Sequence, residues 1–172
     1  MRTTLAIGLF LAVTCFHATA ADRTDLSQFR LTMAGLGPVR NGMTIEQLRR
    51  AGFRLATPSS GDFSDCAQAR ILGQEDVGLL IENNRVTRIE LYSNRIYSLS
   101  GSRIGDTEDE IEMTYKKYGD SLSVEPHPFD HQGRVVKIFS PDQTTSIAFE
   151  IHGHVVTQIY AGPAAGYVEG CL

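Results

Sequence analysis

The chain lacks any long apolar run after its first 20 residues. No later segment approaches the roughly 18 to 20 uninterrupted apolar residues that a membrane-spanning helix needs, so we expect no integral membrane segment. The chain also lacks an excess of basic residues, since 16 Lys and Arg stand against 20 Asp and Glu. Nucleic acid binding depends on a basic stripe that neutralises phosphates. We therefore expect no nucleic acid partner.

Recognisable catalytic motifs are absent as well. The sequence has no Gly-x-Ser-x-Gly elbow, no glycine-rich phosphate loop, no His-Glu-x-x-His and no Cys-x-x-Cys. Four histidines, His127, His131, His152 and His154, gather in the second half of the chain and could supply ligands for Zn²⁺ or Cu²⁺. Their spacing fits no metal-binding pattern, however, and polar residues in turns are common without a ligand. We expect a protein that is not an enzyme and has no metal or cofactor.

Cysteine is scarce, with 3 residues in the chain of 172. Cys15 lies in an N-terminal stretch, residues 1–20, that has a basic start, a short apolar run and small residues before Ala20. This order is typical of a signal peptide, so we expect cleavage near Ala20 and a periplasmic or secreted protein. Cys66 and Cys171 would then meet in an oxidising compartment, and we predict a disulfide between them.

Two similar phrases open predicted helices. Gly-Met-Thr ends at Thr44 and Gly-Asp-Thr ends at Thr107, and each Thr is followed three residues later by Gln47 or Glu110. This is the capping-box pattern, in which the Thr side chain accepts a backbone N–H and the Gln or Glu side chain returns to the Thr N–H. The sequence therefore predicts a helix start at each Thr.

Alternating apolar residues follow both predicted helices. Residues 77–81 and 86–91 flank an Asn-Asn pair, which tolerates the positive φ of a two-residue hairpin turn. Residues 145–151 and 155–159 form a similar pair around a short turn. We therefore expect the α+β class, with two tandem repeats, each one helix followed by about three or four antiparallel strands, and with the helices on one face of the sheet.

This reading divides the chain into four parts. The parts are a signal peptide (1–20), an N-terminal extension (21–37), a first α+β repeat (38–95) and a second α+β repeat with a C-terminal tail (96–172).

The helix opened by Gly-x-Thr and followed by a small antiparallel sheet resembles the unit of BamE-like envelope lipoproteins. Its duplication resembles the beta-lactamase inhibitor protein family. The resemblance covers residues 38–92 and 102–162, and it implies binding of another protein without a cofactor. The chain departs from these families in having a single cysteine pair, no good lipid-attachment motif and no Trp, so no particular partner carries over.

We expect a periplasmic inhibitor or immunity protein that occludes the active site of an enzyme such as a cell-wall hydrolase. The mild negative charge of the chain would suit a cationic enzyme. The alternatives are an envelope-assembly or scaffold factor, and a hydrolase whose site is built from residues distant in the chain. Aromatic residues are enriched where proteins dock. The candidate partner-binding residues lie in loops or at strand ends and are Tyr92, Tyr97, Phe129, His131 and Tyr160.

Overall fold

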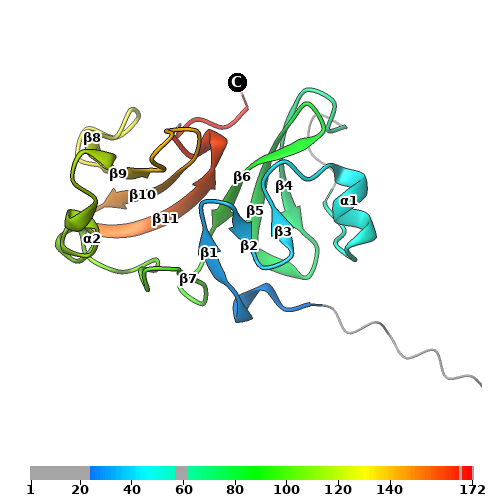
Figure 1. Cartoon of the computed structure of the whole chain (residues 1–172), viewed down its shortest axis with the longest axis horizontal. Coiled ribbons are helices and arrows are strands. Elements are labelled where there is room, and N and C mark those ends of the chain that lie inside the picture. The colour runs from blue at the N-terminus through cyan, green and yellow to red at the C-terminus, as the bar shows by residue number, and fades with distance from the viewer. Residues whose placement is uncertain (1–23, 57–61, 167, 172) are drawn as a thin grey trace, which may run out of the picture.

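The computed structural model describes residues 24–56, 62–166 and 168–171, and the predicted signal peptide lies outside these residues. The described part of the chain is mostly β-structure, with 43% strand and 18% helix (Figure 1). No helix of the described residues is long and apolar enough to cross a membrane. In chain order, the elements are η1 (Leu26–Gln28), β1 (Arg30–Thr32), β2 (Gly35–Leu36), β3 (Val39–Arg40), α1 (Ile45–Arg50), β4 (Cys66–Ile71), β5 (Gln74–Glu82), β6 (Arg85–Leu91), β7 (Tyr97–Ser98), α2 (Glu108–Tyr115), η2 (Lys116–Ser121), β8 (Leu122–Pro126), β9 (Arg134–Phe139), β10 (Ser146–His152), β11 (Val155–Gly162) and η3 (Pro163–Gly166).

The larger sheet has seven strands in the order β4-β5-β6-β11-β10-β9-β8, and every neighbouring pair is antiparallel. Strands β6 and β11 join its two parts, with Ile89 opposite Ala161 and Leu91 opposite Ile159. Strand β5 turns into β6 through Asn83 and Asn84, whose φ angles are 51° and 60°. The predicted two-residue turn with positive φ is therefore confirmed.

A smaller sheet holds four short strands in the order β3-β2-β1-β7. Its apolar residues Leu31, Leu36 and Val39 are completely buried. Strand β1 pairs in parallel with β7, so that Arg30 lies opposite Tyr97. Residues expected to be an extension thus form part of the folded body, because their buried side chains pack into the main core.

The predicted fold of two helix-plus-strand repeats is wrong. The described chain is mostly β, with two α-helices of 6 and 8 residues and with sheets of four and seven strands. The smaller sheet takes strands from both sides of the predicted boundary at residue 96, namely β1 to β3 and β7. Since its strands are only two or three residues long, they leave no clear period in the sequence.

Both capping boxes form as predicted. The Thr44 hydroxyl accepts from Gln47 N–H at 3.2 Å, and the Gln47 side chain accepts from Thr44 N–H at 2.8 Å. Glu110 and Thr107 make the equivalent pair of bonds at 3.3 and 2.8 Å. Leu48 of α1 and Ile111 of α2 are then buried in the same hydrophobic core.

The predicted disulfide between Cys66 and Cys171 is also confirmed, with the two Cα atoms 5.4 Å apart. It joins the first residue of β4, at the edge of the larger sheet, to residues 168–171, here called the C-terminal segment. Disulfides persist in extracellular and periplasmic compartments. The bond therefore agrees with an extracellular or periplasmic location.

Candidate functional site

The larger sheet has one face that packs on the main core and an opposite face, here called the outer face. The outer face carries charged side chains that are nevertheless buried. Alternation along β6 puts Ile89 and Leu91 in the core and turns Arg88 and Glu90 to the other face. The Arg88 Nε and Nη2 atoms donate to Glu90 Oε1 at 2.9 and 2.6 Å, and both side chains are only 1% exposed. Such a pair is retained in a protein interior only when each charge keeps its partner.

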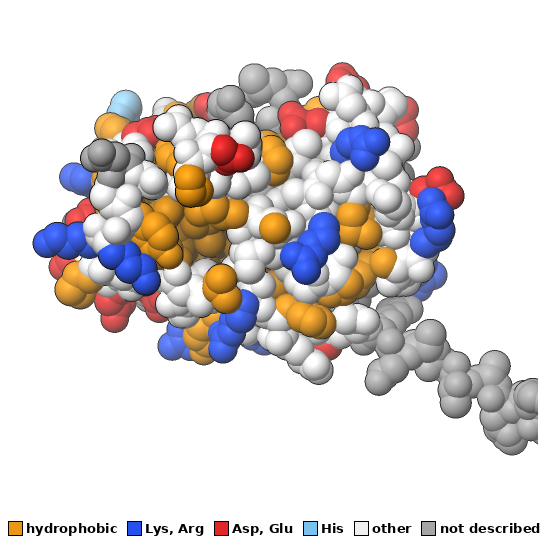
Figure 2. All heavy atoms as spheres, viewed as in Figure 1, with side chains coloured by type: hydrophobic (Ala, Val, Ile, Leu, Met, Phe, Trp, Pro, Cys, Tyr) orange, Lys and Arg blue, Asp and Glu red, His pale blue; other side chains and the backbone are white. Residues whose placement is uncertain are grey.

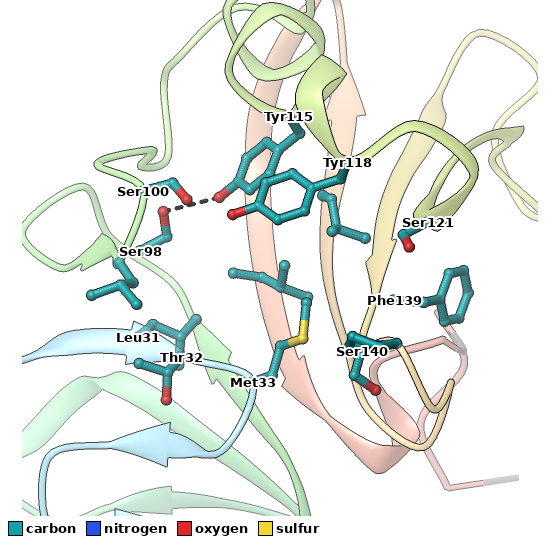
Figure 3. A pocket seen from close by; sticks show the side chains of 14 residues that line it. Leu31, Thr32, Met33, Ser98, Ser100, Tyr115, Tyr118, Ser121, Phe139 and Ser140 are labelled. Atoms are coloured by element: carbon teal, nitrogen blue, oxygen red, sulfur yellow. Dashed lines mark hydrogen bonds between the residues drawn. The ribbon is translucent and has the colours of Figure 1, made fainter.

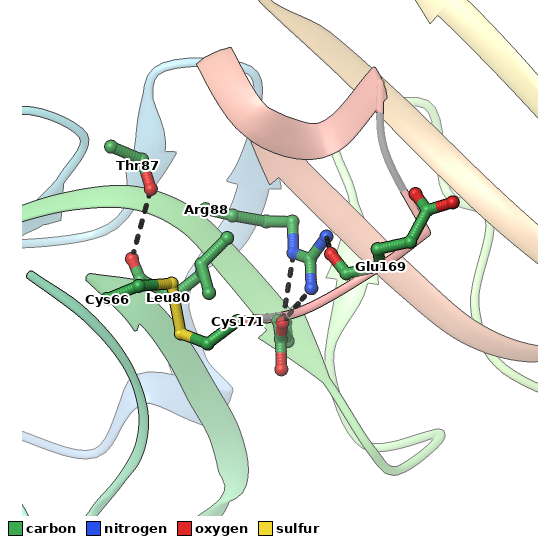
Figure 4. Close-up of a disulfide and its surroundings, with 7 residues drawn as sticks. Cys66, Leu80, Thr87, Arg88, Glu169 and Cys171 are labelled. Atoms are coloured by element: carbon green, nitrogen blue, oxygen red, sulfur yellow. Dashed lines mark hydrogen bonds and ion pairs between the residues drawn. A yellow bond between two sulfur atoms is a disulfide. The ribbon is translucent and has the colours of Figure 1, made fainter. Parts of the chain in front are cut away.

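The C-terminal segment covers this ion pair (Figure 4). The Arg88 Nη1 atom donates to the backbone oxygen of Glu169 at 3.0 Å, and Cys171 is bonded to Cys66 nearby. Ala165 of η3 packs with Tyr160 in a small second apolar cluster. The outer face is therefore partly closed by the end of the chain, which a disulfide and a charge-assisted hydrogen bond hold in place.

Two tyrosines extend the polar network of this face. The Tyr92 hydroxyl donates to Glu90 Oε2 and the Tyr160 hydroxyl donates to Glu150 Oε1. Burial, followed by the neighbouring carboxylate, raises the pKa of each phenol well above its usual value. Both phenols therefore stay protonated and act as hydrogen-bond donors that fix the two carboxylates.

Histidines gather at one end of the same face. Glu150 and His152 are two residues apart on β10 and so project to the same side, and His127 directly follows β8. Glu150 Oε2 lies 3.7 Å from His127 Nε2 and 3.8 Å from His152 Nε2. The ring centres of the two histidines are 4.7 Å apart. Asp130, in the β8–β9 loop, bonds to His152 Nδ1 at 2.6 Å.

A cavity of about 310 Å³ opens elsewhere, between the smaller sheet, the α2–η2 segment and the turn from β9 to β10 (Figure 3). Its apolar wall includes Leu31 and Met33 on one side and Tyr115, Phe139 and Ile147 on the other. No residue that lines it carries a charge. The chemistry of the cavity therefore favours an uncharged guest.

Four of the hydroxyls that line the cavity, on Thr32, Ser98, Tyr115 and Ser140, already bond to other groups of the chain. Ser98 Oγ accepts from Ser102 N–H at 3.0 Å and lies 3.2 Å from the Tyr115 hydroxyl. Thr32 Oγ1 donates to Gly35 O at 3.0 Å, and Ser140 Oγ donates to Asp142 Oδ1 at 2.6 Å. An apolar guest would therefore leave these groups satisfied.

The rim of the cavity is apolar and open to solvent. Leu99 is 73% exposed and Tyr118 is 42% exposed, and both line the opening. Figure 2 shows hydrophobic side chains gathered around a hollow in this face of the molecule. Exposed apolar side chains next to an apolar hollow are typical of a binding surface.

None of the five predicted partner-binding residues lines this cavity. Tyr160 is buried, and both Tyr160 and Tyr92 belong to the outer-face network. The Tyr97 ring contacts both Arg30 and Arg103, whose guanidinium carbons are 4.5 and 5.2 Å from its centre. The structure places these three tyrosines in contacts within the chain.

Phe129 and His131 are exposed in the β8–β9 loop, beside the histidine cluster. Phe129 lies 6.1 Å from the His127 ring, measured between ring centres. Their predicted role in partner binding stays a prediction.

Sequence reasoning missed Glu150, although its position two residues before His152 on an alternating strand was a usable signal.

Sequence reasoning also missed the cavity, because its walls come from segments far apart in the chain.

Comparison with protein-family models, curated proteins and solved structures finds no match for the chain.

Proposed function

We propose that this chain is an exported, non-catalytic protein that binds another protein and holds an apolar side chain of that partner in the uncharged cavity. The cavity and its exposed rim carry the proposal. Export would depend on residues 1–20, with cleavage near Ala20. The disulfide supports a destination outside the cytoplasm.

The cavity is large enough to hold a side chain as its guest. A volume of about 310 Å³ is at the lower end of the roughly 300 to 1,000 Å³ of small-molecule sites. Protein interfaces place their strongest contacts where one large side chain fills a pocket on the other partner. Leu99 and Tyr118 would then be buried around the guest side chain, and their apolar area would add to the affinity.

The proposed mode of action is inhibition by occlusion. A partner enzyme would be blocked when this chain covers its active site, with no covalent step and one molecule bound to each enzyme. The net charge of −4 favours approach to a cationic enzyme, such as a cell-wall hydrolase. A role in envelope assembly, as in BamE-like proteins, is the alternative.

A matched pair of variants tests the proposal. Leu99→Ala and Met113→Ala each remove an exposed apolar side chain, with exposures of 73% and 69%, but only Leu99 lines the cavity. We expect Leu99→Ala and Tyr118→Ala to weaken partner binding by about 2 kcal/mol if they are anchors, and Met113→Ala to leave it unchanged. The measurement is capture of partners from periplasmic extract, followed by titration of each captured enzyme.

An enzyme that loses activity at an equal molar ratio of wild type and Met113→Ala, but not of Leu99→Ala, supports the proposal. Equal inhibition by all three proteins would place the docking surface elsewhere. Capture of outer-membrane assembly proteins, with no enzyme inhibited, would favour the scaffold alternative.

A further inference from the structure

We propose that His127, Glu150 and His152 form a binding site for a divalent transition-metal ion, with Zn²⁺ as its probe. The ligands are the two imidazole Nε2 atoms and the Glu150 Oε2 atom. The site lies on the outer face of the larger sheet, so the inference does not depend on the apolar cavity or on the proposed partner. It replaces the expectation, drawn from spacing alone, that no metal binds.

The three ligand atoms converge on one point. All lie within 4.8 Å of one another, and Glu150 Oε2 is 3.7 and 3.8 Å from the two histidine nitrogens. In a tetrahedral zinc site with bonds of about 2.1 Å, ligand atoms are about 3.4 Å apart. Binding therefore needs only small movements of the side chains toward the ion.

A buried polar atom without a partner points into the same space. His127 Nε2 has no hydrogen-bond partner among the described residues, although the side chain is only 7% exposed. Buried polar atoms normally have a partner, and an exception calls for an explanation such as an ion. A metal ion at the centre of the cluster would satisfy this atom.

Neighbouring groups orient the ligands as in known zinc sites. Because the Asp130 carboxylate accepts from His152 Nδ1 at 2.6 Å, the Nδ1 atom carries the proton and the Nε2 lone pair faces the cluster. This carboxylate–histidine arrangement is typical of metal ligands. The Tyr160 hydroxyl binds Glu150 Oε1 and so leaves Oε2 for the ion.

Gly133 allows the β8–β9 loop to close around the site. A Cβ atom at this position would lie 2.9 Å from His127 Cβ, 3.2 Å from Asp130 Oδ2 and 3.2 Å from His152 Cε1. Any other residue would have to displace the His127 side chain and would crowd Asp130 and His152. The close approach of the loop backbone is thus part of the construction of the site.

One contact must change on binding. Phe129 N–H donates to His127 Nδ1 at 3.2 Å, so in the neutral imidazole the proton is on Nε2. A metal ion at Nε2 would require the other tautomer, in which this single proton sits on Nδ1, because a metal ligand must offer its lone pair. The Phe129 bond is then lost, and the loop residue gives up one long hydrogen bond in exchange for a metal–nitrogen bond.

The ligand set selects the class of ion. Imidazole nitrogens suit Zn²⁺, Cu²⁺ and Ni²⁺, whereas Ca²⁺ and Mg²⁺ prefer oxygen ligands. Three protein ligands leave a fourth tetrahedral position for water or an external group. The His152 side chain is partly exposed, so the ion would have access to solvent on that side.

Calorimetric titration of the chelator-treated, disulfide-bonded protein with ZnCl₂ tests the proposal. We expect one Zn²⁺ per chain in the wild type and a loss of affinity of about 100-fold or more in His127→Gln and His152→Gln, since each removes a ligand. The exposed histidines His131 and His154 provide matched controls, and His131→Gln and His154→Gln should bind as the wild type does. Equal binding by the wild type and the His127→Gln/His152→Gln double variant would overturn the site, as would loss of binding in either control.

Two further measurements do not require removal of a ligand. Asp130→Asn should lower the zinc affinity by about 10- to 100-fold, because it weakens the orientation of His152. In the wild type, long-range ¹H–¹⁵N spectra should show zinc-dependent shifts of the Nε2 signals of His127 and His152. Zinc-dependent shifts confined to His131 or His154 would overturn the proposal even if the ligand variants fail to fold.

Discussion

Arg88 has the largest fully buried side chain among the described residues. It binds Glu90 and the backbone of Glu169, and its guanidinium carbon lies 4.4 Å from the centre of the Tyr160 ring. One side chain thus connects strands β6 and β11 to the C-terminal segment. Removing one partner of a buried ion pair is costly, because the other charge stays out of water.

Arg88→Met keeps most of the side-chain volume and removes the charge. We expect it to lower the free energy of unfolding by about 3 to 5 kcal/mol, since Glu90 is left buried without its cation. Urea denaturation measures the effect. The double variant Arg88→Met/Glu90→Gln should recover part of the loss. If it is no more stable than Arg88→Met, the uncompensated charge is not the cause.

Single residues also show where prediction from sequence can succeed. Glu150 and His152 share a face because of simple alternation along a strand, so two of the three proposed metal ligands could have been placed together. The approach of His127 depends on β8 and β10 lying on either side of β9, so it brings together residues two strands apart that the alternation along one strand does not relate.

At the scale of elements, the two α-helices depend on their first turns. They have 6 and 8 residues, whereas isolated helices shorter than about 12 to 15 residues are marginal in water. Each cap residue also forms an isolated β-bridge with the first strand residue after a hairpin turn. Thr44 pairs in this way with Arg85, and Thr107 pairs with Val155. These starts were predictable because a capping box is contained within four consecutive residues.

The cap of α2 should be sensitive to acid. Hydrogen bonds from the Thr107 backbone N–H and then from its hydroxyl lower the pKa of Glu110 below its ordinary value of 4.5. A lowered pKa in the folded state gives stability that is complete above the ordinary pKa and is lost as the pH falls through the folded one. Glu110→Gln should therefore be less stable than the wild type at pH 7, and the difference should shrink below about pH 4.

Urea midpoints measured from pH 7 to pH 3 check this expectation. The reciprocal change Gln47→Glu in α1 is the matched control, because it places a titratable group in the other capping box and should introduce a similar loss in acid. A constant difference between Glu110→Gln and the wild type across this range would contradict the assignment.

The smaller sheet could not be predicted at this scale. Its strands have two or three residues, which is too short for a period of two to be distinguished from chance. The parallel pairing of β1 with β7 joins residues far apart in the sequence. The cavity has the same origin, because β1 and the residues after β7 form one of its walls.

At the scale of the whole molecule, the disulfide links the edge of the larger sheet to the C-terminal segment. Cys66 and Cys171 are 105 residues apart, so the bond restricts most of the unfolded chain. The chain-entropy model gives about 4 to 5 kcal/mol for a loop of this length, as an upper value. Cys66→Ser/Cys171→Ser should lose up to this amount of unfolding free energy.

Thermal and urea unfolding of the oxidised wild type and the double variant measure this loss, with the reduced wild type as control. Thiol titration of the unfolded, unreduced wild type after export should find no free thiol. Two titratable thiols, or equal stability of all three proteins, would contradict a stabilising disulfide.

The same disulfide also determines how the molecule would respond to a pulling force. All seven strands of the larger sheet lie between Cys66 and Cys171 in the sequence, so the bond closes them into a covalent ring. Tension applied to the two ends of the chain passes through the sulfur atoms and bypasses this sheet. Strands β1, β2 and β3 and helix α1 lie outside the ring and would extend first. Mechanical resistance would therefore come from a covalent bond for the larger sheet, and from noncovalent contacts alone for the N-terminal strands, of which β1 lines the cavity.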